Sequence, residues 1–153
     1  MPPPELDLRR ATLDEILALR HAELRPGRPL ETARFDGDAE PATRHFGAFP
    51  RGGGQPAACV SCMRRPRDGV DAWQIRGMAT RGDLTGRGIG SALLAFALAQ
   101  LAAGGGPRLA WCNARVTALR FWERTGWRVA SPVFDIPDVG PHRVLERTLP
   151  APD

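Results

Sequence analysis

Few side chains in this 153-residue chain can exchange a proton near neutral pH. All 21 lysine-plus-arginine positions are arginine, and the chain contains no tyrosine. Because arginine stays protonated, a general acid or base must come from an aspartate, glutamate, histidine or cysteine. The histidines are His21, His45 and His142. A single histidine is more often structural than catalytic, so each is only a candidate.

A glycine-rich stretch gives the strongest chemical signal. Gly86, Gly88 and Gly90 lie between a predicted strand and the start of a predicted helix. Backbone N–H groups there can turn inward with no side chain in the way, and the positive end of the helix attracts anions. Arg87 adds a further positive charge. The stretch predicts a pyrophosphate site, although a flexible glycine turn would have the same composition.

Two common phosphate-binding motifs do not fit this stretch. A P-loop requires a lysine, and this chain has none. A dinucleotide-binding fold requires Gly-x-Gly-x-x-Gly and an acidic residue about 20 positions later. Ser91 occupies the third glycine position, and no aspartate or glutamate occurs between Asp83 and Glu123. Both motifs are therefore excluded.

The cysteines favour a structural role. Cys59 and Cys62 form a Cys-x-x-Cys pair, a spacing that also occurs in zinc and redox sites. No second pair completes a metal site, and the surrounding apolar residues predict a strand in which the two side chains point to opposite faces. We expect no metal and a reducing compartment, the cytoplasm.

The elements that must position these residues follow a mixed α/β order. A capping box from Thr12 to Glu15 begins the first helix, which ends at Pro26-Gly27. Two further helices are predicted near residues 88–103 and 114–125, and residues 27–41 form a loop or broken helix. Strands are predicted at residues 6–10, 43–49, 57–63, 72–80, 109–112, 127–134 and 142–149. In the strand over 72–80, Trp73, Ile75 and Ala79 are expected to alternate with Gln74, Arg76 and Met78.

Composition supports one α/β domain over residues 1–153, with a proline-rich leader at 1–5. A charged fraction of 25% and a hydrophobic fraction of 42% exclude wholesale disorder. No apolar run approaches the roughly 20 residues of a membrane span, and no signal peptide is visible. The net charge of +4 favours anionic ligands. The arginines are scattered without interleaved aromatic residues, which argues against a nucleic-acid partner.

Two segments resemble the GNAT N-acetyltransferases. Thr85-Gly-Arg-Gly-Ile-Gly90 aligns with the family motif Gln/Arg-x-x-Gly-x-Gly/Ala, with Thr85 as the departure. Ala118-Leu-Arg-Phe-Trp-Glu-Arg-Thr-Gly-Trp127 is similar to Ala-x-x-Phe-Tyr-x-x-x-Gly-Phe, with Trp122 at the tyrosine position. The resemblance extends over nearly the whole chain and is strongest over residues 73–127. Two further segments, Leu19-Arg-His-Ala-Glu-Leu-Arg-Pro-Gly27 and Val139-Gly-Pro-His-Arg143, resemble a small bacterial branch of the ElaA type. The resemblance implies the GNAT acyl-CoA N-acyltransferase fold, a mostly antiparallel central sheet flanked by helices.

The resemblance also implies a cofactor, acetyl-CoA or another acyl-CoA, and no metal. The strand before the glycine loop would pair its backbone with the pantetheine arm, and the loop N–H groups would take the pyrophosphate. The backbone N–H of Met78 or Ala79 would hold the oxyanion. The implied cofactor-binding residues are Met78, Ala79, Thr80, Thr85, Gly86, Arg87, Gly88, Ile89, Gly90, Ser91, Asn113, Arg115 and Trp122.

The implied reaction is direct attack of a primary amine on the thioester in a ternary complex, which requires a base for the ammonium proton. His142 is the preferred base, because it lies where the last strand meets a loop that lines the acceptor site in the family. The indole of Trp122 donates a hydrogen bond but no useful proton. The thiolate therefore leaves unprotonated, or Cys112, His142 or a water supplies the proton.

The acceptor is expected to be a small-molecule or peptide amine, with no membrane partner and a monomeric or homodimeric enzyme. The acceptor-contacting candidates are Arg76, His21 and Arg25. Arg76 would orient a substrate carboxylate or form a structural ion pair. The alternative function is a degenerate acyl-CoA sensor without turnover, which the missing tyrosine favours. Thiol release from acetyl-CoA in the presence of amines discriminates the two functions.

Overall fold

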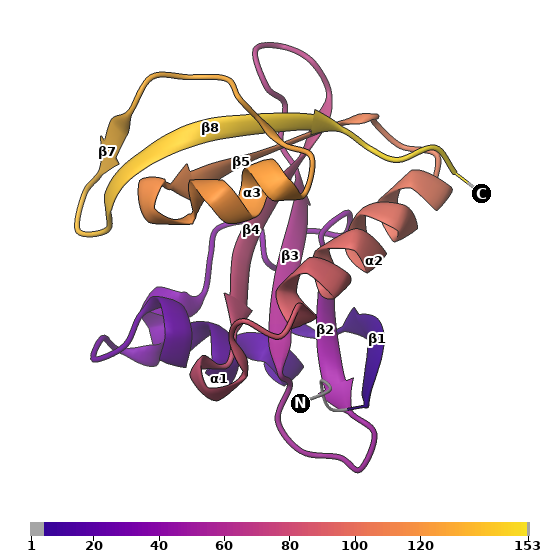
Figure 1. Cartoon of the computed structure of the whole chain (residues 1–153), viewed down its shortest axis with the longest axis vertical. Coiled ribbons are helices and arrows are strands. Elements are labelled where there is room, and N and C mark those ends of the chain that lie inside the picture. Colours follow the sequence, from indigo (N-terminus) through magenta and orange to yellow (C-terminus); the bar gives the residue numbers. More distant parts are fainter. Residues whose placement is uncertain (1–4, 153) are drawn as a thin grey trace.

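A computed structural model describes residues 5–152 (Figure 1). The helices are α1 (Leu13–Leu24), α2 (Ile89–Ala103) and α3 (Leu119–Arg124), with short 3-10 helices η1 (Leu30–Ala33), η2 (Gly82–Leu84) and η3 (Val116–Ala118). The strands are β1 (Leu6–Ala11), β2 (Arg44–Pro50), β3 (Ala58–Arg64), β4 (Ala72–Thr80), β5 (Leu109–Arg115), β6 (Arg128–Val129), β7 (Phe134–Ile136) and β8 (Gly140–Thr148). Apart from Glu5, the proline-rich leader predicted at residues 1–5 lies outside the described residues.

All strands belong to one sheet in the order β1-β2-β3-β4-β5-β8-β6, with β7 also pairing with β8. Every pair is antiparallel except β4 with β5. The parallel pairing covers only Ala72–Gln74 against Leu109–Trp111, and beyond it the two strands separate. Figure 1 shows the result, in which β5 and β8 run across the direction of β2, β3 and β4. The mostly antiparallel mixed sheet confirms the predicted fold class.

Helices pack against both faces of the sheet. The apolar residues of α2, among them Leu93 and Leu94, are buried in the larger of two hydrophobic clusters. On the other face, Ile16 and Leu19 of α1 pack with Cys59 and Ala79. Fully burying one such leucine stabilises the fold by about 1.5–3 kcal/mol, so these contacts fix both helices against the strands. The predicted capping box of α1 is present, since Thr12 Oγ1 accepts the Glu15 N–H at 3.2 Å and the Glu15 carboxylate accepts the Thr12 N–H at 2.9 Å.

The expected alternation along β4 is wrong after Arg76. A β-bulge lies between β3 and β4, because Cys59 opposes Ala79 whereas Ser61 opposes Arg76. The extra residue lies in β4 at Gly77, whose φ of +61° suits a glycine. As a result Met78 packs with the same cluster as Ile75, while Ala79 faces the α1 side. The bulge reverses which side chains of β4 face each helix.

The elements predicted after α2 also differ from those in the structure. The helix predicted from residue 114 begins later, at Leu119, because Ala114 and Arg115 extend β5 and oppose Arg143 and His142 of β8. The strand predicted over 127–134 divides into β6 and β7. Pro132 lies between them and has no N–H for a ladder. The Ser131 hydroxyl accepts the Val144 N–H at 2.8 Å in place of a backbone carbonyl.

Candidate active site

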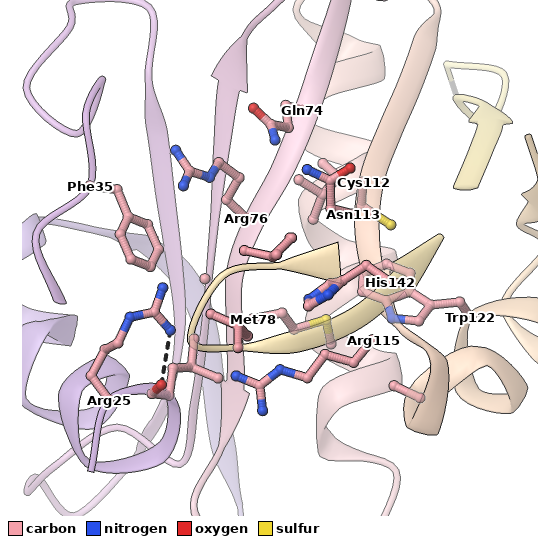
Figure 2. A pocket seen from close by; sticks show the side chains of 17 residues that line it. Arg25, Phe35, Gln74, Arg76, Met78, Cys112, Asn113, Arg115, Trp122 and His142 are labelled. Carbon is pink, nitrogen blue, oxygen red and sulfur yellow. Dashed lines mark hydrogen bonds between the residues drawn. The ribbon is translucent and has the colours of Figure 1, made fainter. Parts of the chain in front are cut away.

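The separation of β4 from β5 opens a cavity in the middle of the sheet (Figure 2). Its volume is about 280 Å³, and its walls come from β4, β5, β8, α3, the end of α1 and the loop after η1. The lining includes eight of the residues singled out from the sequence, which are Arg25, Arg76, Met78, Cys112, Asn113, Arg115, Trp122 and His142. Phe35 and Gln74 also line it. The topology therefore brings together candidates that are more than a hundred positions apart in the sequence.

His21 does not line the cavity. Its Nε2 lies 2.6 Å from the carbonyl oxygen of Arg28, so the ring holds the turn that follows α1. The loop over residues 85–91 and the pair Ala79 and Thr80 also lie outside the cavity lining. Ala79 and Thr80 end β4, whereas residues 85–91 follow η2 and continue into α2, so these candidates lie farther along the chain than the cavity-lining Met78.

The backbone N–H and C=O groups of β4 point alternately toward β3 and toward the gap beside β5. The Arg81 N–H donates to the Ala57 carbonyl across the β3–β4 pair at 2.8 Å. Backbone groups of an antiparallel strand alternate in direction, so those of Ala79 also face β3, and those of Thr80 and Met78 face the gap toward β5. Within the described residues 5–152, no strand pairs with this edge of β4 beyond Gln74. Of the two N–H groups proposed for the oxyanion, that of Met78 is therefore the one directed into the gap.

The glycine loop leaves open space at the start of α2, which suits an anion. Gly86 and Gly88 both have φ of +78°, and a Cβ built on either would meet no atom within 4 Å. Gly88 is the N-cap of α2, and among the residues that the structure describes no side chain caps this end of the helix. The first N–H groups of α2 therefore face open space at the positive end of a 15-residue helix. A Cβ at Gly90 would instead approach Thr80 Oγ1 at 3.2 Å and Met78 Cε at 3.3 Å, so Gly90 lets the helix pack closely on β4.

His142 is 3% exposed and its ring lies beside that of Phe134, with centroids 6.2 Å apart. Its Nδ1 lies 2.7 Å from the Gly140 carbonyl oxygen. A carbonyl oxygen only accepts, so Nδ1 carries the proton and the neutral ring keeps its lone pair on Nε2. Over residues 5–152 no hydrogen-bond partner is found for Nε2. His142 is thus held in the tautomer that can accept a proton from within the cavity.

Neither Cys112 nor Trp122 is an effective proton donor, but Trp122 can donate a hydrogen bond. Cys112 is 1% exposed, and burial raises the pKa of its thiol, which makes it a weak proton source. Trp122 is fixed by edge-on packing against Trp127, at 5.1 Å between centroids, and against Phe121, at 5.4 Å. Its N–H can donate a hydrogen bond but no proton near neutral pH.

The other two cysteines confirm the predicted strand geometry. Cys59 packs on the α1 side of the sheet and Cys62 on the α2 side, and both are buried. Burial raises the pKa of the Cys59 thiol to about 12 and also raises that of Cys62. Within residues 5–152 no group of three or more histidine, cysteine, aspartate or glutamate side chains could hold a metal ion. No described helix has the length and apolar character needed to cross a membrane.

A buried polar network behind the cavity was not predicted. Arg20 is 0% exposed and forms two hydrogen bonds with the Asp38 carboxylate, at 2.7 and 3.0 Å. It also donates to the Ser61 hydroxyl at 2.7 Å, and this hydroxyl lies 2.6 Å from His45 Nδ1. A signal was available, because Arg20 occupies the same helical face as the buried Ile16. No sequence pattern marks Phe35, which a loop places over this network.

Comparisons with known proteins agree with this geometry. The model of the acetyltransferase (GNAT) family matches residues 11–127. The uncharacterized N-acetyltransferase YitI of Bacillus subtilis is 30% identical over 145 residues, which cover 94% of this chain and 97% of that protein.

Solved structures show the same fold. Escherichia coli ElaA has a TM-score of 0.76 at 15% identity, covering 94% of this chain and 99% of that one. An aminoglycoside 6'-N-acetyltransferase complexed with coenzyme A has a TM-score of 0.70 at 14% identity, covering 96% of this chain and 99% of that one.

Proposed function

Because this chain belongs to the GNAT acetyltransferase family and is an N-acetyltransferase, we propose that it transfers an acetyl group from acetyl-CoA to a primary amine of a small acceptor. The amine would attack directly, with both substrates bound at once. The observation that carries this proposal is the gap between β4 and β5, which joins a strand edge without a partner to a cavity that holds an available histidine nitrogen.

The residues around the gap fit an acyl-CoA. The backbone groups of Met78 and Thr80 face the gap and can pair with the amides of a pantetheine arm. Gly86, Gly88 and the uncapped start of α2 leave open space beside free N–H groups, which suits a pyrophosphate. A solved relative of the same fold was complexed with coenzyme A, which supports this choice of cofactor. When bound, acetyl-CoA supplies a thioester whose carbonyl carbon can accept an amine.

His142 is proposed as the general base. Its Nε2 is free to take the ammonium proton directly or through one water, while Nδ1 remains fixed on the Gly140 carbonyl. The Met78 N–H, directed into the gap, would stabilise negative charge on a carbonyl oxygen placed there. Trp122 offers its indole N–H as a hydrogen-bond donor to a sulfur in the cavity. Cys112 is too weak an acid to protonate the departing sulfur, which would therefore leave as the thiolate, and the second proton that the nitrogen loses as the amide forms would pass to water.

Thiol release from acetyl-CoA tests this function. We expect primary amines from a diverse panel to increase thiol release above the hydrolysis measured without amine, and mass spectrometry to find the N-acetyl product. Secondary and tertiary amines of matched size serve as controls. Tight CoA binding with no amine-dependent thiol release would instead show the acyl-CoA sensor.

A further inference from the structure

One wall of the cavity presents two arginines around an aromatic ring. The guanidinium carbons of Arg76 and Arg25 lie 4.6 and 5.4 Å from the centre of the Phe35 ring. Arg25 donates to the Leu24 carbonyl at 2.9 Å, and Arg76 reaches the Asp36 carbonyl at 3.5 Å. A guanidinium has five N–H donors, so both side chains keep donors free for a ligand.

These two charges have no carboxylate partner among residues 5–152. The salt bridges found there include neither Arg25 nor Arg76, nor Arg115 on the β5 side. The described residues that line the cavity include no aspartate or glutamate. Arg20, whose guanidinium carbon lies 4.2 Å from the centre of the same ring, is different because Asp38 neutralises it. The cavity therefore carries positive charge that the protein itself does not balance.

The surroundings of both arginines oppose their charge. Burial is the main cause that lowers the pKa of Arg25, followed by the positive charges of Arg115, Arg28 and Arg20. Burial also lowers the pKa of Arg76, followed by the charge of Arg20, and the negative charge of Asp38 opposes this lowering only in part. An adjoining cavity of about 240 Å³ includes Arg28 and one acid, Asp138, which forms no salt bridge with these arginines. A bound anion would offset this unfavourable crowding of positive charge.

We propose that Arg25 and Arg76 form an anion subsite beside Phe35, so that the acceptor is a small amine bearing a carboxylate or phosphate group. This inference rests on the proposed acetyl transfer. The planar guanidinium of arginine can form paired hydrogen bonds with a carboxylate or with a phosphate, so the subsite would accept either group. Figure 2 shows Arg25, Arg76 and Phe35 on one side of the cavity and His142 and Trp122 on the other. An acceptor that bridges the cavity would direct its amine toward His142.

The test measures binding of unreactive product analogues in anionic and neutral pairs. The carboxylate pair is N-acetylglycine with N-acetylglycinamide, and the phosphate pair is N-acetyl-O-phosphoethanolamine with N-acetylethanolamine. Calorimetric titrations are made with and without saturating CoA, on the wild type and on Arg25→Gln, Arg76→Gln and Arg10→Gln. Arg10 is the matched control, an exposed arginine on the edge strand β1 that lies outside this cavity.

We expect the wild type to bind the anionic member of at least one pair about tenfold or more tightly than the neutral member, and the preferred pair identifies the group. Each of Arg25→Gln and Arg76→Gln should lower the affinity for the anionic probe by roughly 10- to 100-fold, the loss typical of a charge-assisted hydrogen bond. The affinity for the neutral probe should stay unchanged. Arg10→Gln should change neither.

Equal binding of anionic and neutral members by the wild type would overturn the subsite. So would a loss of CoA affinity in Arg25→Gln or Arg76→Gln without a change in probe preference, because the arginines would then hold the cofactor. A subsite that passes this test in a protein that acetylates no amine would leave the anion inference standing and refute the proposed activity instead.

Discussion

At the scale of single residues, the two buried histidines differ in how many ring nitrogens form hydrogen bonds within the protein. His142 commits only Nδ1 to the protein, whereas His45 commits both ring nitrogens, with Nδ1 2.6 Å from Ser61 Oγ and Nε2 3.0 Å from the Asp38 carbonyl oxygen. Their exposed fractions are similar, at 3% and 7%. The difference in hydrogen bonding therefore separates a catalytic candidate from a structural residue where burial does not.

We predict that His142→Gln lowers kcat by about 10²–10⁴-fold, the usual contribution of a general base. The variant should also lose the acidic limb of the pH–rate profile, while its affinity for CoA stays close to that of the wild type. Steady-state kinetics with any accepted amine, together with CoA titration, measure both effects.

His45→Gln is the matched control for this prediction. This substitution removes a histidine that is about as buried as His142 but does not line the cavity. It should therefore lower stability and leave kcat unchanged. A His142→Gln enzyme with a normal rate and an unchanged acidic limb would show that His142 is structural.

At the scale of elements, the glycine loop and the start of α2 form the proposed phosphate site. Gly88→Asn fills the open space at this position without straining the backbone. Asparagine tolerates a positive φ and is a favourable N-cap. Its side chain, however, occupies the space that the phosphates would need. We predict that this variant stays folded, with a Tm within a few degrees of the wild type. It should bind CoA at least about tenfold more weakly.

Gly105→Asn is the control, since Gly105 has a similar φ of +74°, has the same open surroundings and lies just past the other end of α2. It should leave CoA binding unchanged. Calorimetric titration with CoA and thermal unfolding compare the two variants. If Gly88→Asn binds CoA as the wild type does, the phosphates do not lie over this residue.

The elements also show what could be predicted from the sequence. The capping box, the glycine loop and the strand–helix order depend on local patterns, and these indicated the fold class. Together with the family resemblance they indicated eight of the seventeen residues that line the cavity. The bulge at Gly77 could not be predicted, because it depends on how β3 and β4 pair and not on residue type alone. The continuation of β5 to Arg115 likewise depends on β8, which lies about 30 positions later.

At the scale of the whole molecule, one buried network connects the parts that form the cavity. Arg20 belongs to α1, Asp38 to the loop that carries Phe35, His45 to β2 and Ser61 to β3. Asp38 also accepts the Phe35 N–H at 2.6 Å, which fixes the ring beside the arginines. Removing one partner of a buried ion pair typically costs about 3–5 kcal/mol, because the other charge remains buried and unpaired. The Arg20–Asp38 and Asp38–Phe35 contacts thus stabilise the fold and also hold the aromatic wall of the cavity.

This network makes global stability depend on pH through His45. The Ser61 hydroxyl accepts from Arg20, so its own proton is directed to His45 Nδ1, and Nε2–H donates to the Asp38 carbonyl. The ring is therefore neutral. Burial lowers the pKa of His45, the charges of Arg20 and Arg10 lower it further, and Asp38 opposes them. The unfolded chain takes up a proton on this histidine near pH 6.5, where the folded protein does not.

Stability should consequently be fully present above about pH 6.5 and decrease as the pH falls, since the unfolded state then binds more protons. Between pH 7 and 5.5 we expect His45 to lower the free energy of unfolding, by at most about 1.4 kcal/mol per pH unit for one proton. His45→Gln should be less stable than the wild type at pH 7, because Ser61 loses its acceptor, but the difference should narrow as the pH falls to 5.5. Urea unfolding at a series of pH values measures this. Parallel pH dependences for the two proteins would mean that His45 is not held neutral by the network.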